Sequence, residues 1–202
     1  MSPPAMAAIL ATLLSILHET VACAQTDAPP FAGRLAVRPL FGTSIPVGDF
    51  GRALNRSSFL GADVKYNVGR PLALGVAVWK TGYRGSGPFA RSTHDVWRYV
   101  VSPTAYVAHA TVSGHLVKPY WHLQCGGARM GFTGIARDRI TKPYLAAGTG
   151  VEVFVTGSTA ADPSAQFGTI VSSSNTNSAI AICFGYHCYL NTPRSGRAPA
   201  GR

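Results

Sequence analysis

The chain has 202 residues, of which 47% are hydrophobic and only 13% are charged. Soluble domains usually carry about 25% charged residues and about 7% glycine, and this chain has 22 glycines. Lys and Arg number 18 against 8 Asp and Glu, a formal net charge of +10. The basic residues are scattered rather than grouped on one face, so we expect no nucleic-acid partner. Frequent Pro and Gly interrupt every helical stripe, which favours an all-β fold.

The first 24 residues are expected to be an export signal. The apolar run from Ala5 to Leu17 has the length of a signal-peptide core and is too short to span a bilayer as a helix. Ala22-Cys23-Ala24 offers a cleavage site, so the mature chain would begin at Gln25. The segment before the run lacks the Lys or Arg typical of such signals, and an apolar N-terminal helix is the alternative.

Apolar residues at alternate positions predict eight strands after this signal. In AIAICFGYHCYL, residues 179–190, bulky residues such as Ile182 and Phe184 share one face, and small or polar residues such as His187 share the other. Tilted strands of about 9–11 residues are what a bilayer requires. The predicted strands are 34–43, 59–68, 72–83, 96–107, 117–130, 143–155, 165–172 and 179–190.

The predicted links alternate in length. The link 69–71 is short, whereas 44–58, 84–95 and 131–142 are longer and hold six arginines. The links 108–116 and 156–164 are rich in Gly, Ser and Pro and are expected to be loops. Short turns at one rim and longer loops at the other, with both termini on the short-turn side, are typical of a transmembrane barrel.

Two stretches carry a family resemblance. LFGTSIPVGDFGRALNRSSFLGADVKYNVGRPLALGVAV, residues 40–78, resembles the first hairpins of small outer-membrane β-barrel proteins, including a Pro-x-Gly-Asp-Phe loop at 46–50. PYLAAGTGVEV, which begins at Pro143, resembles a glycine-rich strand of the same porin-like or OmpA-like class. The resemblance implies an eight-stranded antiparallel up-and-down transmembrane β-barrel in a Gram-negative outer membrane. It implies insertion by the barrel-assembly machinery, and it implies no reaction.

Members of this class usually have an aromatic residue at the C-terminus. Here the last predicted strand ends at Leu190, and twelve residues follow it. We expect a signal peptide at 1–24, an outer-membrane barrel domain at 25–190 and a disordered basic tail at 191–202.

An eight-stranded barrel is only wide enough for side chains to fill it, and buried charges must be paired. We therefore predict an internal polar network in which Asp63 and Glu152 accept hydrogen bonds from cations and plug the barrel. A narrow polar conduit is the alternative. The predicted members are Arg38, Asp63, Lys65, Arg98, Glu152 and His187, with His122 and Gln124 on the same face.

No catalytic motif stands out. The chain contains neither G-x-S-x-G nor H-E-x-x-H. Ser92 lies near His94 and Ser113 near His115, and both pairs are expected to be solvated turn residues. The cysteines at 125, 183 and 188 lack zinc-ligand spacing, and the last two would face opposite sides of one strand. We expect no enzyme activity, cofactor or metal.

The sequence therefore predicts a non-enzymatic integral outer-membrane barrel with a structural or surface role. A narrow pore is an alternative role for the same barrel. We expect the protein to be a monomer. Its partners would be outer-membrane lipid and, through the Arg-bearing loops, the phosphates of lipopolysaccharide. The alternative is a soluble exported lipocalin-like barrel that binds a small apolar ligand, with an apolar interior and a polar exterior. Five aromatic residues lie near predicted strand ends. In a membrane barrel they would form an interfacial girdle, and in a soluble barrel they would belong to the core. They are Trp97, Tyr99, Tyr120, Trp121 and Tyr144.

Overall fold

The computed structural model describes residues 32–69, 71–90, 92–133, 140–172 and 177–190. The predicted signal peptide and basic tail lie outside these residues. The described segments form two short helical turns, α2 (Asp49–Ala53) and η1 (Gly87–Phe89), and nine strands. The strands are β1 (Leu35–Val47), β2 (Ser57–Asn67), β3 (Leu72–Arg84), β4 (Thr93–Tyr106), β5 (Ala110–Val112), β6 (His115–Thr133), β7 (Ile140–Thr156), β8 (Thr159–Ile170) and β9 (Asn177–Leu190).

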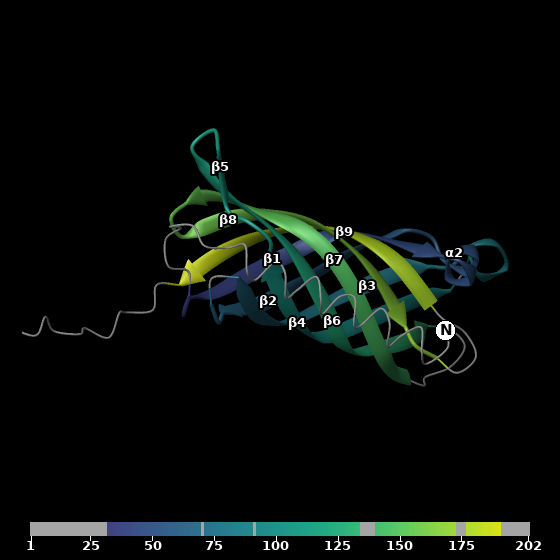
Figure 1. The fold of residues 1–202 in the computed structure, drawn as a ribbon. Coiled ribbons are helices and arrows are strands. Elements are labelled where there is room, and N and C mark those ends of the chain that lie inside the picture. The colour runs from purple at the N-terminus through teal and green to yellow at the C-terminus, as the bar shows by residue number, and fades with distance from the viewer. Residues whose placement is uncertain (1–31, 70, 91, 134–139, 173–176, 191–202) are drawn as a thin grey trace, which may run out of the picture.

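Eight of these strands close into a barrel (Figure 1). Each strand pairs antiparallel with its neighbours in the sequence, and β1 pairs with β9 to complete the ring. β5 lies outside the ring, because it pairs with the beginning of β6 while β4 and β6 pair directly. The predicted eight-stranded antiparallel up-and-down barrel is confirmed.

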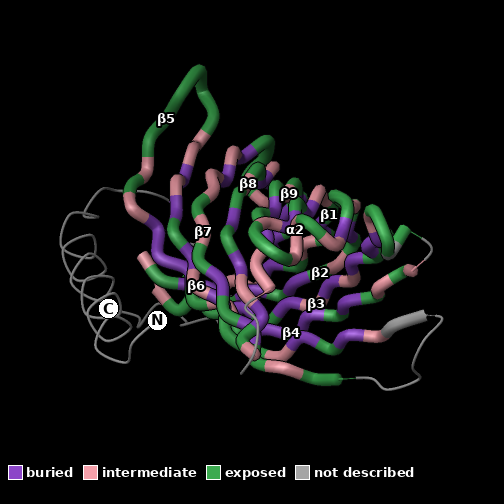
Figure 2. The backbone as a smooth tube through the Cα atoms, turned by 90° about the vertical axis from the view of Figure 1, so that its right-hand side faces the viewer, coloured by how far each residue is buried: buried purple, intermediate pink, exposed green. Residues whose placement is uncertain are grey.

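Burial alternates along every wall strand, as Figure 2 shows. In β9, Ile180, Ile182 and Phe184 are exposed on the outer face, whereas Ala181, His187 and Tyr189 are buried in the lumen. The outer face is apolar over most of its area, and the lumen holds nearly all of the buried charged residues. Among the described residues, no helix is long and apolar enough to cross a lipid bilayer.

The barrel has two different ends, which lie at opposite sides of Figure 1. The hairpin end carries the start of β1, the end of β2, the end of β9 and the turn 157–158. The loop end carries α2 in the link 48–56, and η1. At the loop end, Phe50 of α2 contacts Tyr83 with ring centroids 5.3 Å apart, and Leu54 is buried against the same cluster. The first long loop therefore packs apolar groups against the cluster at this end of the lumen.

Two predicted links are wrong. The link 156–164 shrinks to a two-residue turn, since β8 begins at Thr159 rather than at Ala165. Its Asp162-Pro163 pair suggests a turn, but Pro163 faces outward where the β7–β8 ladder has a gap, so its missing N–H costs no ladder bond there. The link 108–116 contains a projecting β5–β6 hairpin, whose turn residues Ser113 and Gly114 have φ of 50° and 80°.

The aromatic residues divide between the two faces of the wall. Trp97, Tyr99 and Trp121 are exposed on the outer surface, as a girdle requires. Tyr120 and Tyr144 are buried in the lumen, so for them the girdle expectation is wrong. Tyrosine is compatible with either face, because its ring is apolar and its hydroxyl can bond to buried polar groups.

If the outer face lies in lipid, a charge at its middle is costly. Ile182 lies near the centre of β9, and Leu190 ends the same strand. We expect Ile182→Arg to lower the free energy of unfolding by about 2–4 kcal/mol, and Leu190→Arg by about 0–1 kcal/mol. Reversible urea unfolding in phospholipid vesicles measures both. Equal effects of the two substitutions would contradict a lipid-facing band.

Candidate functional site in the barrel lumen

Two buried carboxylates organise the centre of the lumen, and Asp162 of β8 is the first. Its side chain is fully buried and pairs with Arg38, which reaches it from β1. Tyr120 of β6 donates its hydroxyl to Oδ1 at 2.6 Å, and His187 Nε2 lies 2.8 Å from Oδ2. One carboxylate thus connects β8 to β1, β6 and β9. Arg38 also pairs with Asp63 of β2, which extends the connection to a fifth strand.

Glu152 of β7 is the second buried carboxylate, and it is also fully buried. It pairs with Lys65 of β2. The hydroxyls of Tyr106 and Tyr189 donate to its two oxygens at 2.7 and 2.6 Å. Both oxygens of this carboxylate are therefore satisfied by groups from three other strands.

His187 links the two carboxylates. Its Nε2 lies 2.8 Å from Asp162 Oδ2 and 3.5 Å from Glu152 Oε1. Lys118 is a third cation and is buried, with Nζ 4.0 Å from the centroid of the Tyr106 ring. The central layer thus holds three cations, Arg38, Lys65 and Lys118, and three carboxylates, Asp63, Glu152 and Asp162. It carries no net charge when His187 is neutral, which is the condition for keeping charges in a medium of low dielectric constant.

Glycines on the inner face make room for this layer. A Cβ on Gly185 would lie 2.5 Å from Arg38 Cδ, and one on Gly148 would lie 2.7 Å from His122 Nε2. A Cβ on Gly150 would overlap the Tyr120 hydroxyl. These glycines are therefore required for packing, because long polar side chains cross the lumen directly over them and leave no room for a Cβ.

The structure places all six predicted members of the network on the inner face and brings five of them together. Arg98 is the exception. It is buried nearer the loop end, where it donates to Thr81 Oγ1 at 2.8 Å and to the Tyr83 hydroxyl at 3.1 Å. Its guanidinium also lies 5.4 Å from the centroid of the Tyr144 ring. The predicted pairing of Arg98 with Asp63 or Glu152 is wrong, because hydroxyls and aromatic faces surround this cation instead.

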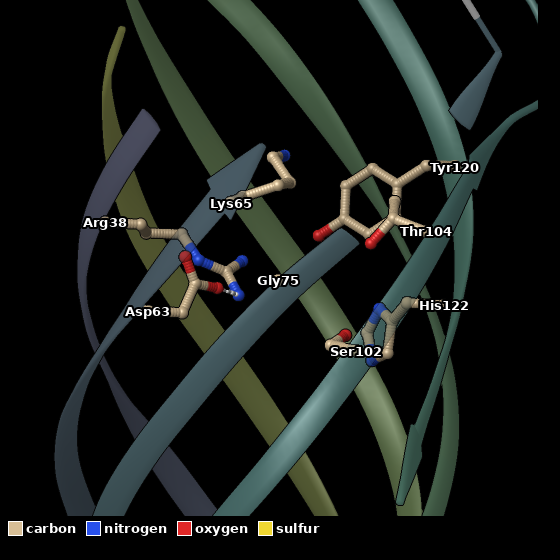
Figure 3. A pocket seen from close by; sticks show the side chains of 8 residues that line it. All are labelled: Arg38, Asp63, Lys65, Gly75, Ser102, Thr104, Tyr120 and His122. Atoms are coloured by element: carbon tan, nitrogen blue, oxygen red, sulfur yellow. Dashed lines mark hydrogen bonds and ion pairs between the residues drawn. The ribbon is translucent and has the colours of Figure 1, made fainter. Parts of the chain in front are cut away.

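A small polar cavity lies beside the network (Figure 3). Its volume is large enough for about one water molecule. Oδ1 of Asp63 and Nε of Arg38 are buried without a hydrogen-bond partner among the described residues, and both residues line it. Such a cavity is far below the roughly 300–1,000 Å³ of a small-molecule pocket. Its lining residues are Arg38, Asp63, Lys65, Gly75, Ser102, Thr104, Tyr120 and His122.

Glu152, Asp162 and His187 also form a cluster of potential metal ligands, with one donor atom from each within 4.8 Å of the others. Arg38 and Lys65 already pair with these two carboxylates. A metal cation at this point would meet two fixed positive charges. The cluster is better described as an ion-pair network than as a metal centre.

Of the two Ser–His pairs, only one forms a direct contact. Ser92 Oγ lies 2.9 Å from His94 Nε2 at the loop end. His115 Nδ1 instead lies 3.1 Å from the carbonyl oxygen of Phe154, and Ser113 occupies the hairpin turn. The three cysteines of the described residues are free thiols; Cys125 and Cys188 are exposed, and Cys183 is partly buried.

Sequence reasoning missed Asp162, Lys118 and the three tyrosines of the network. Asp162 falls in the predicted link 156–164, whose Gly, Ser and Pro content is typical of a loop. Counting back along β8 from Ile170 in steps of two would have found it, because Gln166, Ser164 and Asp162 continue the same inward face. The tyrosine hydroxyls could not be assigned, because their partners lie on distant strands.

A comparison with protein-family models finds no match, and a comparison with curated proteins finds none either. Solved structures do resemble the barrel. Neisserial surface protein A, NspA, has 14% sequence identity and a TM-score of 0.60, covering 76% of this chain and 96% of its own. The N-terminal β-barrel domain of Pseudomonas aeruginosa OprF has 10% identity and a TM-score of 0.56, covering 80% and 100%.

Ail, the attachment invasion locus protein of Yersinia pestis, solved with the heparin analogue sucrose octasulfate, has 17% identity and a TM-score of 0.54. The match covers 79% of this chain and 99% of Ail. At such identities the likeness establishes the fold, which is that of small outer-membrane barrels. The lipocalin-like alternative is wrong, because it requires an apolar lumen with room for a ligand and a polar exterior.

The charge balance of the central layer makes a quantitative prediction. Glu152→Gln should lower the free energy of unfolding by about 3–5 kcal/mol, because it leaves one buried cation without its carboxylate. Adding Lys65→Met should recover at least about 1 kcal/mol, because the layer becomes neutral again. Denaturant unfolding in vesicles measures both variants.

The matched control is Asp95→Asn, which removes the exposed partner of Lys80 and should change stability by no more than about 1 kcal/mol. A double variant less stable than Glu152→Gln alone would contradict the charge-balance account.

Proposed function

We propose that the chain is a non-enzymatic integral protein of a Gram-negative outer membrane, a surface or structural barrel whose lumen is sealed. The observation that supports this most strongly is the polarity of the wall. Paired charges fill the inside, and large apolar side chains such as Leu60, Val76 and Ile182 cover the outside. Water would favour the opposite arrangement, whereas lipid favours this one.

The different lengths of the connections at the two ends of the barrel indicate how it would be oriented in the membrane. In outer-membrane barrels the short turns face the periplasm and the longer loops face the exterior. The hairpin end, with both ends of the described chain, would then be periplasmic, and the loop end with Arg52, Arg56 and Arg84 would be external. β9 pairs with β1 over most of its length, so it is the strand that the barrel-assembly machinery would have to close.

Three layers support a sealed lumen rather than a pore. The central ion-pair layer is flanked at the hairpin end by a cluster that contains Phe154 and Tyr189. At the loop end it is flanked by an aromatic and aliphatic cluster that includes Trp79, Tyr83 and Tyr144. A hydrated ion would have to displace side chains in all three layers.

A conductance measurement tests the sealed lumen. The folded chain, added to a planar lipid bilayer at neutral pH, should give no discrete openings at moderate voltage. Insertion is checked in the same preparation by heat-modifiable gel migration of the recovered protein. Discrete, reproducible openings by heat-modifiable protein would favour the narrow pore instead.

The Ser92–His94 contact raises one alternative, a lipid acyl hydrolase. The non-enzymatic proposal predicts that cells expressing the wild-type chain and cells expressing Ser92→Ala/His94→Ala have the same lipid A acyl composition by mass spectrometry. Both chains should be folded and present at equal levels in the membrane. Loss of an acyl chain only in cells with the wild-type protein would overturn the non-enzymatic proposal.

A further inference from the structure

The outer wall carries its charges on one side only. Among the described strand residues, four charged side chains face outward, and all lie on three adjacent strands near the loop end. β1, β2, β7, β8 and β9 have no outward charge within their described parts. The four residues are Lys80 and Arg84 on β3, Asp95 on β4 and Arg129 on β6, a net charge of +2.

Two of these cations lie in one row with an aromatic residue between them. The strand register pairs Lys80 with Trp97, and Trp97 with Arg129. Adjacent strands are about 4.8 Å apart, so the two cations start roughly 10 Å from each other across the Trp97 side chain. Trp97 stacks on Tyr99, with ring centroids 6.4 Å apart and an interplanar angle of 12°. The row thus places an aromatic side chain between two cations, and Lys80 Nζ lies 5.8 Å from the centroid of the Trp97 ring.

The row lies where the apolar band of this wall stops. Along β3 the outward residues from Leu72 to Val78 are apolar, and Lys80 is the first charge. At about 3.3 Å per residue and the tilt of barrel strands, Lys80 lies roughly 20 Å from Leu72 along the barrel axis. The apolar band of such barrels is about 25 Å tall. Lys80, Trp97 and Arg129 therefore lie close to the outer edge of the band, from which the long side chains of Lys80 and Arg129 can extend to the external lipid headgroups.

We propose that this row, Lys80–Trp97–Arg129, binds the phosphate group of a phosphorylated glycolipid in the outer leaflet. This rests on the proposed function, and it moves the expected lipid contact from the loops to the barrel wall. The two cations bind the phosphate, and the Trp97–Tyr99 stack packs against the sugar or the start of the acyl chains. Arginine can contact a phosphate through two parallel hydrogen bonds, which gives the site its strongest contact.

Asp95 lowers the affinity of the site for phosphate. Its carboxylate lies 2.8 Å from Lys80 Nζ, and both side chains are about half exposed, at 51% and 42%. An ion pair this exposed is weak and can be exchanged for a phosphate contact. The carboxylate also repels an incoming phosphate. Removing Asp95 should therefore strengthen lipid binding, an effect opposite to that of removing the cations.

Native mass spectrometry of the folded full chain, released from neutral detergent and titrated with diphosphorylated lipid A, tests the site. We expect Lys80→Gln/Arg129→Gln to weaken binding about tenfold or more, and Asp95→Asn to tighten it a few-fold. The matched control, Arg52→Gln/Arg56→Gln, removes two exposed cations of the same end outside the row and should change binding less than about twofold.

Dephosphorylated lipid A should bind wild type and the Lys80/Arg129 variant equally, and millimolar inorganic phosphate should not displace the lipid. Equal loss in the control variant would mean a general charge effect, and displacement by phosphate would mean a soluble anion site; either overturns the proposal. So does unchanged binding of the double variant. If the wild-type chain formed no heat-modifiable barrel in detergent, the proposed function itself would fail.

Discussion

The structure depends on two carboxylates, Glu152 and Asp162, that are buried in a narrow lumen and cannot be left unpaired. An isolated charge in a low-dielectric interior costs several kcal/mol, so each carboxylate needs a cation and hydrogen-bond donors in fixed positions. Those partners come from other strands of the barrel. They are Arg38, Lys65 and the tyrosines at 106, 120 and 189. Contacts that run across the lumen join strands that are not neighbours, which sheet hydrogen bonds alone cannot do.

The same requirement accounts for the unusual composition. Long polar side chains can cross an eight-stranded lumen only where facing positions are small, and Gly148, Gly150 and Gly185 provide that space. With the polar groups satisfied inside, the outer face can be almost entirely apolar, and a low share of charged residues follows. The outward charges that remain on the described strands are confined to β3, β4 and β6 near the loop end, where the proposed membrane position would bring them to the headgroups rather than the hydrocarbon.

The alternation of side chains made the fold predictable, because period two specifies both the strand and the face of each residue. Arg38, Asp63, Lys65, Glu152 and His187 were assigned to the lumen on that basis, and the structure places them there. The hydrogen-bond and ion-pair partners of each residue are harder to predict, because they depend on its position along the barrel axis, which the strand tilt changes. Arg98 lies at a different level from the carboxylates and bonds to Thr81 and Tyr83 instead. Asp162 lies in a segment rich in Gly, Ser and Pro, which predicts a loop, although its proline is tolerated in a wall strand where the ladder has a gap.

The proposed function and the proposed lipid site both require that the apolar face of the wall contacts lipid. Nitroxide labels placed singly at 179 through 184 of β9, in a chain whose cysteines are replaced by serine, measure this by electron paramagnetic resonance in reconstituted vesicles. Labels at 180, 182 and 184 should collide readily with oxygen and rarely with a water-soluble nickel reagent, whereas labels at 179, 181 and 183 should be reached poorly by both. Ready access of the nickel reagent at 180, 182 and 184, or no alternation at all, would contradict the account.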